Sequence, residues 1–171
     1  MQYRSRPVAL VPPRAHATAR LPFRRLLCAV DFSDASLKAV EWAASLADES
    51  DAALTLLHVL TWPWAEPPPP MLADLPAEQG FALAEYRRYT EESARRRLES
   101  LIPESIPASR ATPRLENGKP YVQLLTVAAE EESDLIVIGI RGRSPLDTAL
   151  LGSATNQVVR RAGCPVLTLR G

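Results

Sequence analysis

The sequence has few of the residues that metal sites, disulfide frameworks and histidine-dependent hydrolases require. Of its 171 residues, two are cysteine and two are histidine. Cys28 and Cys164 are far apart and form neither a C-x-x-C pair nor a zinc-ligand spacing, so we expect buried, reduced thiols. One of the two histidines lies in the N-terminal segment, and no Ser-His-Asp or Cys-His constellation can be assembled from what remains.

The chain also lacks a charge excess and a long apolar run. Its formal net charge is zero, so no overall field attracts nucleic acid or an acidic membrane. No apolar run approaches the ~20 residues that a membrane-spanning helix needs. We therefore expect neither nucleic acid nor a membrane as partner, and the reduced thiols favour a cytoplasmic location.

The first 22 residues contain no acidic side chain and no apolar centre. Pro7, Pro12, Pro13 and Pro22 interrupt this segment, and a secretory signal would need an apolar central region. We expect residues 1–22 to form a disordered, basic, proline-rich tail. Residues 23–171 then form one domain, because a chain of this length has room for a single ordinary core.

From residue 24 onward, short apolar runs alternate with helical patterns. This alternation predicts a single doubly wound α/β domain, with a parallel sheet and helices on both faces. Ligands of such sheets bind beyond the carboxyl ends of the strands, where the strand order reverses. The predicted strands are 25–30, 53–59, 111–115, 134–138 and 165–169, and the predicted helices begin at 33 or 34, at 79, at 120 and at 153.

The predicted third helix begins at Pro120, a residue that suits the first helical position. Its expected inward face carries Val122, Leu125, Ala128 and Ala129. The segment 63–76, between the second strand and the second helix, contains four consecutive prolines. We expect this insert to be an exposed loop that either folds over the site or binds a partner.

The most informative pattern is a set of glycines behind the strand 134–138. The sequence Gly-Ile-Arg-Gly at 139–142 is followed, after nine residues, by Gly152 and Ser153. Glycine lets the backbone approach a ligand closely, and a helix start offers unpaired N–H groups and a partial positive charge. Together these features predict a site for a phosphate chain.

Each member of this pattern also has a purely structural interpretation. Ser153 caps a helix with or without a ligand, and Gly142 and Gly152 are also ordinary turn residues. Arg141 and Arg143 offer forked donors to phosphate oxygens, although a solvated side chain is the alternative for Arg143. The joint spacing is more specific than any single member.

Three further groups are candidates for a place in the site. Asp31 either accepts hydrogen bonds from a ribose hydroxyl or an adenine amino group, or caps the helix that begins near Ser33. His58 is interpreted as a satisfied core residue rather than a base. The acidic run Glu130–Glu132 is interpreted as a solvated cluster at the opposite end of the sheet.

Other nucleotide-binding motifs are missing. Neither the Walker pattern G-x-x-x-x-G-K-[ST] nor G-x-G-x-x-G after a strand occurs. Phosphoryl transfer needs an acidic side chain that holds a metal ion near the phosphates. Asp147 is the only acidic residue close to these glycines in the sequence. These absences favour binding over catalysis, so we expect no enzyme, with a slow ATPase or a nucleotide-free interaction protein as the alternatives.

The segments 30–33, 56–59 and 134–139, together with the G-x-x-G-(nine)-G-S spacing, resemble the universal stress protein family over residues 24–170. The glycine spacing is similar to that of the family's ATP-binding branch. The resemblance implies a five-stranded parallel sheet in the order 3-2-1-4-5, with ATP and Mg²⁺ as ligands. It implies a nucleotide-dependent sensor or regulator in the stress response, and a homodimer that pairs the last strands, Val166 to Leu169.

The resemblance also implies which residues would contact the nucleotide. Many relatives carry Ser-His or Ser-Arg between the first two glycines, so Ile140 here removes one hydroxyl. The implied contacts are Ala29, Val30 and Asp31 at adenine and ribose, Leu54 in the base pocket, Ile138 and Gly139 at the ribose, Gly142 at the first phosphates, and Gly152, Ser153, Ala154 and Thr155 at the phosphate tail.

Overall fold

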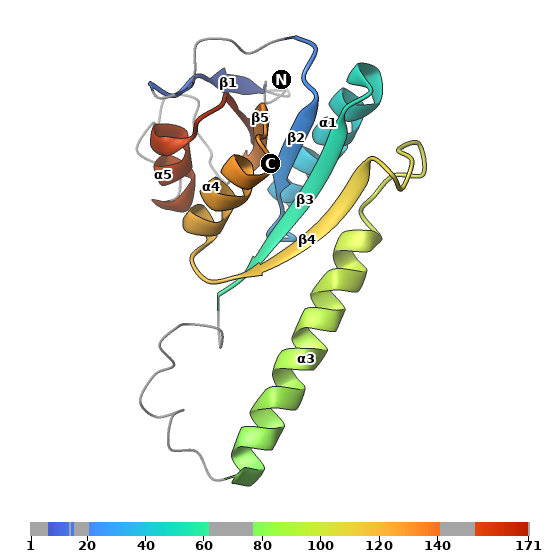
Figure 1. Ribbon diagram of the computed structural model, residues 1–171, viewed down its shortest axis with the longest axis vertical. Helices are drawn as coiled ribbons and strands as arrows, with labels where there is room; N and C mark the ends of the chain where they lie inside the picture. Colours follow the sequence, from blue (N-terminus) through green and yellow to red (C-terminus); the bar gives the residue numbers. More distant parts are fainter. Residues whose placement is uncertain (1–6, 14, 16–20, 62–76, 141–152, 171) are drawn as a thin grey trace, which may run out of the picture.

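The computed structural model describes residues 7–13, 15, 21–61, 77–140 and 153–170, with the side chains of 77–83 and 153 left out. Six strands form one sheet in the order β1-β6-β5-β2-β3-β4 (Figure 1). The strands are β1 (Val8–Leu10), β2 (Arg25–Ala29), β3 (Ala53–Leu60), β4 (Ala111–Asn117), β5 (Leu135–Ile140) and β6 (Val166–Arg170).

The expected five-stranded sheet is wrong by one strand. β1 pairs antiparallel with β6 at one edge, whereas the pairings among β2 to β6 are all parallel. These five parallel strands, taken alone, keep the relative order 3-2-1-4-5. The sixth strand arises because an edge strand presents unpaired N–H and C=O groups that a short apolar segment can pair.

β1 also corrects the expected N-terminal tail. Residues 8–10 lie inside the segment 1–22 that we expected to be disordered, yet they are hydrogen-bonded to β6. The sequence Val-Ala-Leu at these positions belongs to an apolar run between the early prolines, and such a run can pair with a strand. Residues 8–10 of the N-terminal segment are therefore a strand of the domain's sheet.

The helices cover both faces of the sheet. α1 (Asp34–Ser50) and α3 (Ala77–Glu99) pack on one face, and α4 (Pro120–Glu130) and α5 (Ser153–Arg161) pack on the other. Each face of the sheet has its own hydrophobic core, and successive strand residues point into opposite cores. Leu26 and Cys28 of β2 face α1, and Leu27 faces α4 and α5. None of the helices in the described ranges is long and apolar enough to cross a membrane.

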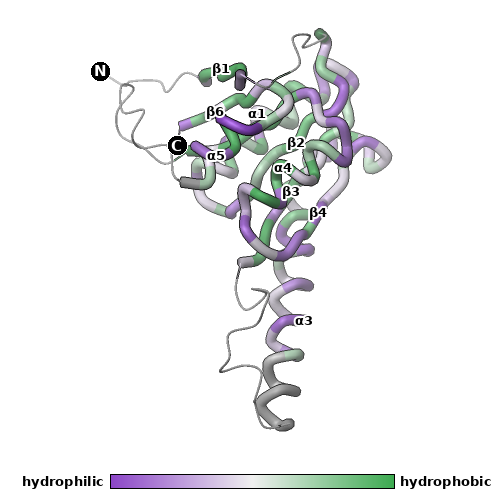
Figure 2. Tube along the Cα trace, turned by 60° about the vertical axis from the view of Figure 1, so that its left-hand side comes forward, coloured by the Kyte–Doolittle hydropathy of each residue, from purple (hydrophilic) through white to green (hydrophobic). Residues whose placement is uncertain are grey.

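α3 extends well beyond the sheet that its C-terminal half covers (Figures 1 and 2). Ala94 and Leu98 are buried against the sheet, and Leu98 belongs to the core on the α1 side. Tyr86 and Tyr89, closer to the N-terminus of the helix, are exposed. Burial therefore anchors α3 through its C-terminal turns.

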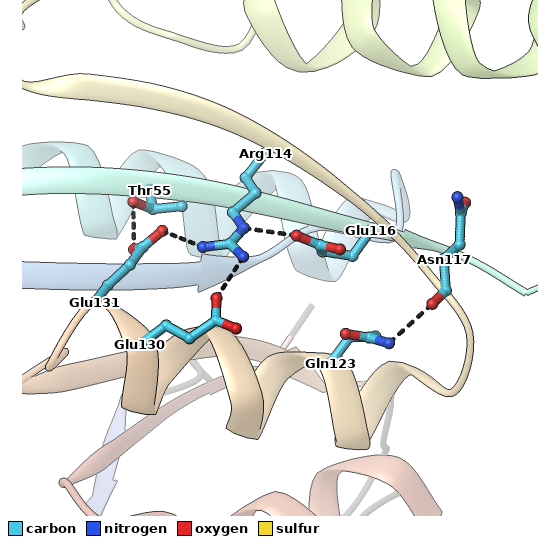
Figure 3. A network of polar contacts seen from close by, with 7 residues as sticks. All are labelled: Thr55, Arg114, Glu116, Asn117, Gln123, Glu130 and Glu131. Carbon is cyan, nitrogen blue, oxygen red and sulfur yellow. Dashed lines mark hydrogen bonds and ion pairs between the residues drawn. The ribbon is translucent and has the colours of Figure 1, made fainter.

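Arg114 of β4 is the centre of a polar network that attaches this edge strand to α4 (Figure 3). Its guanidinium donates to Glu116 at 2.8 Å, to Glu131 at 3.0 Å and to Glu130 at 2.6 Å. Thr55 of β3 also donates to Glu131, at 2.8 Å. The interpretation of 130–132 as a merely solvated cluster is therefore wrong for the first two glutamates.

The third glutamate of the run has a partner as well. Glu132 accepts from Arg25 of β2, with 2.9 Å between Nη2 and Oε2. Both side chains of this pair are more than half exposed, at 52% and 76%, so the pair contributes little stability. Sequence patterns did not predict these contacts, because each arginine lies in a strand and the glutamates follow a helix, so that only the folded sheet brings them together.

We predict that Arg114→Gln lowers the free energy of unfolding by roughly 1–3 kcal/mol, because three carboxylates lose a charged donor and repel one another. Arg88→Gln is the matched control, since Arg88 is 73% exposed and its pair with Glu85 is 3.9 Å long. That control should change stability by less than about 0.5 kcal/mol. Urea unfolding followed by circular dichroism measures both, and equal effects would contradict the structural role of Arg114.

Candidate functional site

A cavity of about 250 Å³ lies at the carboxyl edge of the parallel strands, between the sheet and the first turns of α4 and α5. Its volume is just below the ~300–1,000 Å³ of most small-molecule sites. The lining residues are Ala29, Val30, Asp31, Ser36, Leu57, His58, Val59, Pro120, Tyr121, Leu124, Ile138, Gly139, Ala154, Thr155 and Val158.

Strand register creates the floor of the cavity. Ala29, the last residue of β2, pairs with Leu57 of β3 on one side and with Ile138 of β5 on the other. All three side chains contribute to the core on the α4 and α5 side. Leu124 of α4 and Val158 of α5 close the same core, so the floor and walls are apolar.

Polar groups gather at the rim, where β2 passes into α1. Ser33 is the N-cap of α1, and its Oγ accepts from the amide of Ser36 at 3.4 Å. Asp31 Oδ1 accepts from both the amide, at 3.0 Å, and the hydroxyl of Ser33. Ser33, and not Asp31, is therefore the cap of α1; Asp31 holds that capping residue and also lines the cavity, and its contact with a ribose or an adenine stays a prediction.

Phe32 has a left-handed backbone, with φ of 60°, which is uncommon for a residue with a side chain. A conformation of this kind costs about 1 kcal/mol or more and persists only where neighbours fix it. The Arg97 guanidinium of α3 lies 4.0 Å from the Phe32 ring centroid, and the His58 ring centroid lies 4.5 Å away. α3 and β3 thus hold the loop that carries Asp31.

His58 is satisfied, as expected, but it also lines the cavity. Its Nδ1 lies 2.7 Å from the carbonyl oxygen of Val30, so Nδ1 carries the hydrogen and the neutral ring has Nε2 as its acceptor. Burial lowers the pKa of His58, and the positive charge of Arg97 acts in the same direction. The Val30 hydrogen bond and the charge of Asp31 oppose this shift without reversing it.

We predict that His58 makes the protein less stable in mild acid. In the unfolded chain its pKa returns to about 6.5 and it binds a proton below that pH, whereas the folded chain resists protonation. The stability present above pH 6.5 is therefore lost as the pH falls through the lower folded pKa. In His58→Asn, which keeps a donor for Val30, the melting temperature should fall less between about pH 7 and pH 5.

The control for this measurement is His16→Asn, which removes the only other histidine of the sequence. It should leave the pH dependence of the melting temperature as in the unmodified chain. A wild-type melting temperature that rises on acidification, or an identical acid response in His58→Asn, would contradict the assignment.

Seven of the predicted contact residues do line the cavity: Ala29, Val30, Asp31, Ile138, Gly139, Ala154 and Thr155. Ser153 begins α5 next to them, as predicted. Arg141, Gly142 and Gly152 lie outside the described residues, so their part in the site stays a prediction.

Leu54 is misplaced in the predicted site. It is the second residue of β3, it is fully buried, and it packs in the core on the α1 side. The cavity lies at the other end of the same strand, where it is lined by Leu57, His58 and Val59. Because ligands bind beyond carboxyl ends, a position further along β3 was the better choice.

Gly139 has a structural reason to be glycine in addition to its place in the cavity. A Cβ built there would fall on the backbone carbonyl group of Ala35, in the first turn of α1. The close approach of β5 to α1 therefore requires glycine whether or not a ligand binds. Substitution of Gly139 would disturb packing and cannot report on ligand contact alone.

The sequence-based prediction of the site did not include the residues of α4 that form one wall of the cavity. Pro120, Tyr121 and Leu124 line the cavity, and the Arg161 guanidinium lies 5.8 Å from the Tyr121 ring centroid. A signal was available, because a helix that follows a parallel strand begins at the carboxyl edge of the sheet. Pro120 indicates such a helix start in the sequence, and its place beside the cavity follows from it.

Comparison with known proteins gives one consistent result. The Universal stress protein family matches residues 22–170. A universal stress protein of Thermus aquaticus is 32% identical over 148 residues, covering 86% of this chain and 99% of that protein. Universal stress protein YxiE of Bacillus subtilis is likewise 32% identical, over 149 residues, with the same coverage.

Solved structures agree with the sequence relatives. Universal stress protein UspA from Lactobacillus plantarum has a TM-score of 0.65 and 26% identity, covering 88% of this chain and 100% of that one. A universal stress protein in complex with cAMP has a TM-score of 0.56 and 24% identity, covering 86% and 97%, a likeness that shows the fold alone.

Proposed function

The chain belongs to the universal stress protein family, and on that premise we propose that it binds an adenine nucleotide, ATP with Mg²⁺, as a regulator in the stress response. The observation that supports this most directly is the cavity at the carboxyl edge. It brings the ends of β2, β3 and β5 to the first turn of α5. An apolar floor suits a flat base, and the polar rim suits a ribose.

The phosphates would extend from this cavity toward the start of α5. Ala154 and Thr155 line the cavity in the first helical turn, where amides point outward and the helix dipole favours an anion. We propose that these amides, with Gly142, Gly152 and Ser153, bind the phosphate chain. The cAMP complex of a protein with the same fold supports an adenine nucleotide as the ligand class.

We propose that Mg²⁺ arrives with the phosphates. Within the described ranges, no group of three or more His, Cys, Asp and Glu side chains could hold a metal ion. Mg²⁺ commonly keeps several waters and binds through nucleotide phosphates with one or two carboxylates. In that role it would neutralise phosphate charge, and the chain's own residues would fix the base and the ribose.

We also propose that the protein is a cytoplasmic binding module and not an enzyme. Asp31 is engaged by the Ser33 cap, and Nδ1 of His58 is engaged by the Val30 carbonyl group. Nε2 of His58 is left as the acceptor of the ring, but no Ser-His-Asp or Cys-His constellation can be assembled around it from the sequence. A slow ATPase is the second candidate, supported by the presence of these same titratable groups at the cavity.

The direct test is nucleotide retention. The purified chain is denatured, and the released small molecules are separated by ion-exchange chromatography. We expect ATP itself. Gly142→Val and Gly152→Val should each abolish retention, because a side chain would occupy the space of a phosphate.

Gly163→Val is the matched control, because a Cβ at Gly163 has open space around it. That variant should retain ATP as the unmodified chain does. ATP retained by both Gly142→Val and Gly152→Val would refute the phosphate assignment. Recovery of ADP in place of ATP would favour the slow ATPase.

A second prediction concerns the base. Tyr121 lines the cavity from α4 with Arg161 over its ring, an arrangement that suits stacking on adenine. Tyr121→Leu should weaken ATP binding by about 1 kcal/mol, roughly fivefold in Kd, as measured by titration calorimetry. Tyr121→Phe, which keeps the ring, should bind as the unmodified chain does. If Tyr121→Leu bound equally well, the base would lie elsewhere.

A further inference from the structure

Arg97 connects α3 to the loop that carries Asp31. Its guanidinium carbon lies 4.0 Å from the centroid of the Phe32 ring, a distance at which a cation is attracted to an aromatic face. Arg97 is itself exposed, so this contact is not forced by packing in a core. The consequence of the contact falls on the Phe32 ring and on the loop around it.

Phe32 is a residue whose backbone needs support from outside the loop. Its φ of 60° is left-handed, and a bulky side chain keeps this conformation only where its neighbours fix it. The ring packs against the core that contains Val30 and Leu98, and its centroid lies 4.5 Å from that of the His58 ring. Arg97 adds a charged contact from α3. Two elements, β3 and α3, therefore fix this backbone.

The same loop places Asp31 at the cavity. Asp31 Oδ1 accepts from the Ser33 amide at 3.0 Å, and the Asp31 amide donates to Ser36 Oγ at 3.3 Å. Asp31 lines the cavity, whereas the ring of the next residue, Phe32, contacts α3. Because the two residues share a peptide bond, a change in the backbone of Phe32 also moves the carboxylate of Asp31.

α3 is anchored to the domain through its C-terminal turns alone among its described side chains, and Arg97 lies in those turns. Ala94 and Leu98 are buried against the sheet, and the helix extends from there beyond the sheet (Figures 1 and 2). An element with few buried contacts opens locally at a low free energy. One added contact at Arg97 therefore changes the local stability of this anchor measurably.

We propose that Arg97 is a positioning residue of the candidate nucleotide site, and that its contact with Phe32 couples this site to α3. Nucleotide bound at Asp31 then stabilises the C-terminal turns of α3. The anchored helix in turn raises the affinity for nucleotide, because coupling between two sites is reciprocal. This inference rests on the proposed nucleotide binding and adds the element of the chain that responds to it.

Arg97→Gln tests the positioning role, because it removes the cation and keeps a polar side chain. We expect ATP binding to weaken roughly two- to fivefold in Kd, the range that a cation–π contact at an exposed site supports. Arg97→Lys keeps the cation and should lose less. Arg96→Gln is the matched control, because Arg96 is exposed and pairs with Glu92 of the same helix at 3.8 Å. That variant should bind ATP as the unmodified chain does.

A double-mutant cycle shows whether Arg97 acts through the Phe32 ring. Phe32→Leu removes the ring and keeps an apolar side chain. In that background Arg97→Gln should cause no further loss of affinity, because the group that it contacts is already absent. Titration calorimetry measures all four proteins. Additive losses would show that Arg97 acts by another route and would overturn the proposed coupling.

Hydrogen exchange followed by NMR measures the coupling itself. ATP should slow the exchange of the amides of residues 94–99 in the unmodified chain and in Arg96→Gln, and should slow it less in Arg97→Gln. A purely structural arginine would not change this response to ATP. In the nucleotide-free proteins, the Ser33 amide should exchange faster in Arg97→Gln, because the loop has lost its support from α3.

Two further results would overturn the inference. One is an Arg97→Gln variant whose Kd for ATP and whose Ser33 exchange both equal those of the unmodified chain. The other is ATP binding that leaves the exchange of residues 94–99 unchanged. If none of the proteins bound ATP, the proposed function would fail, and the Ser33 exchange of the nucleotide-free proteins would by itself decide whether Arg97 positions the loop.

Discussion

The parallel pairing of β2 with both β3 and β5 is the constraint on which the rest of the structure depends. It places Ala29 between Leu57 and Ile138 and so defines the floor of the cavity. Asp134 fixes this register at the opposite edge, where its carboxylate accepts from the amides of Arg24, at 2.7 Å, and Arg25, at 3.1 Å. A slip of one residue would turn every side chain of β2 to the other face.

Much of this arrangement could be predicted because it depends on local periodicity. The strands 25–30 and 53–59 and the helix beginning at Ser33 are recognisable from apolar spacing and a capping residue, and the structure moves their ends by only a residue or so. β1 could not be found in that way. Its three residues carry no period, and its partner strand lies about 160 positions away in the sequence.

The errors in the site have two physical origins: a strand pattern does not show which end of the strand lies at the site, and a mostly apolar helix does not show which face points inward. Leu54 belongs to the right strand and lies at the wrong end of it. In α4 nearly every position is apolar, so the spacing allowed more than one inward face. Leu124 and Val127 are buried, whereas Val122 and Ala129, expected to face inward, are exposed. That rotation is why Leu124 and Tyr121 were overlooked as cavity residues.

The two edges of the sheet are protected by different means, and the difference follows from their sequences. β4 carries Arg114 and Glu116 within the strand and is attached to α4 by ion pairs, so charge discourages pairing with another chain. β6 has no charged residue from Val166 to Leu169, and its outer edge is paired with the covering strand β1. A three-residue strand does this at a small cost in ordered chain.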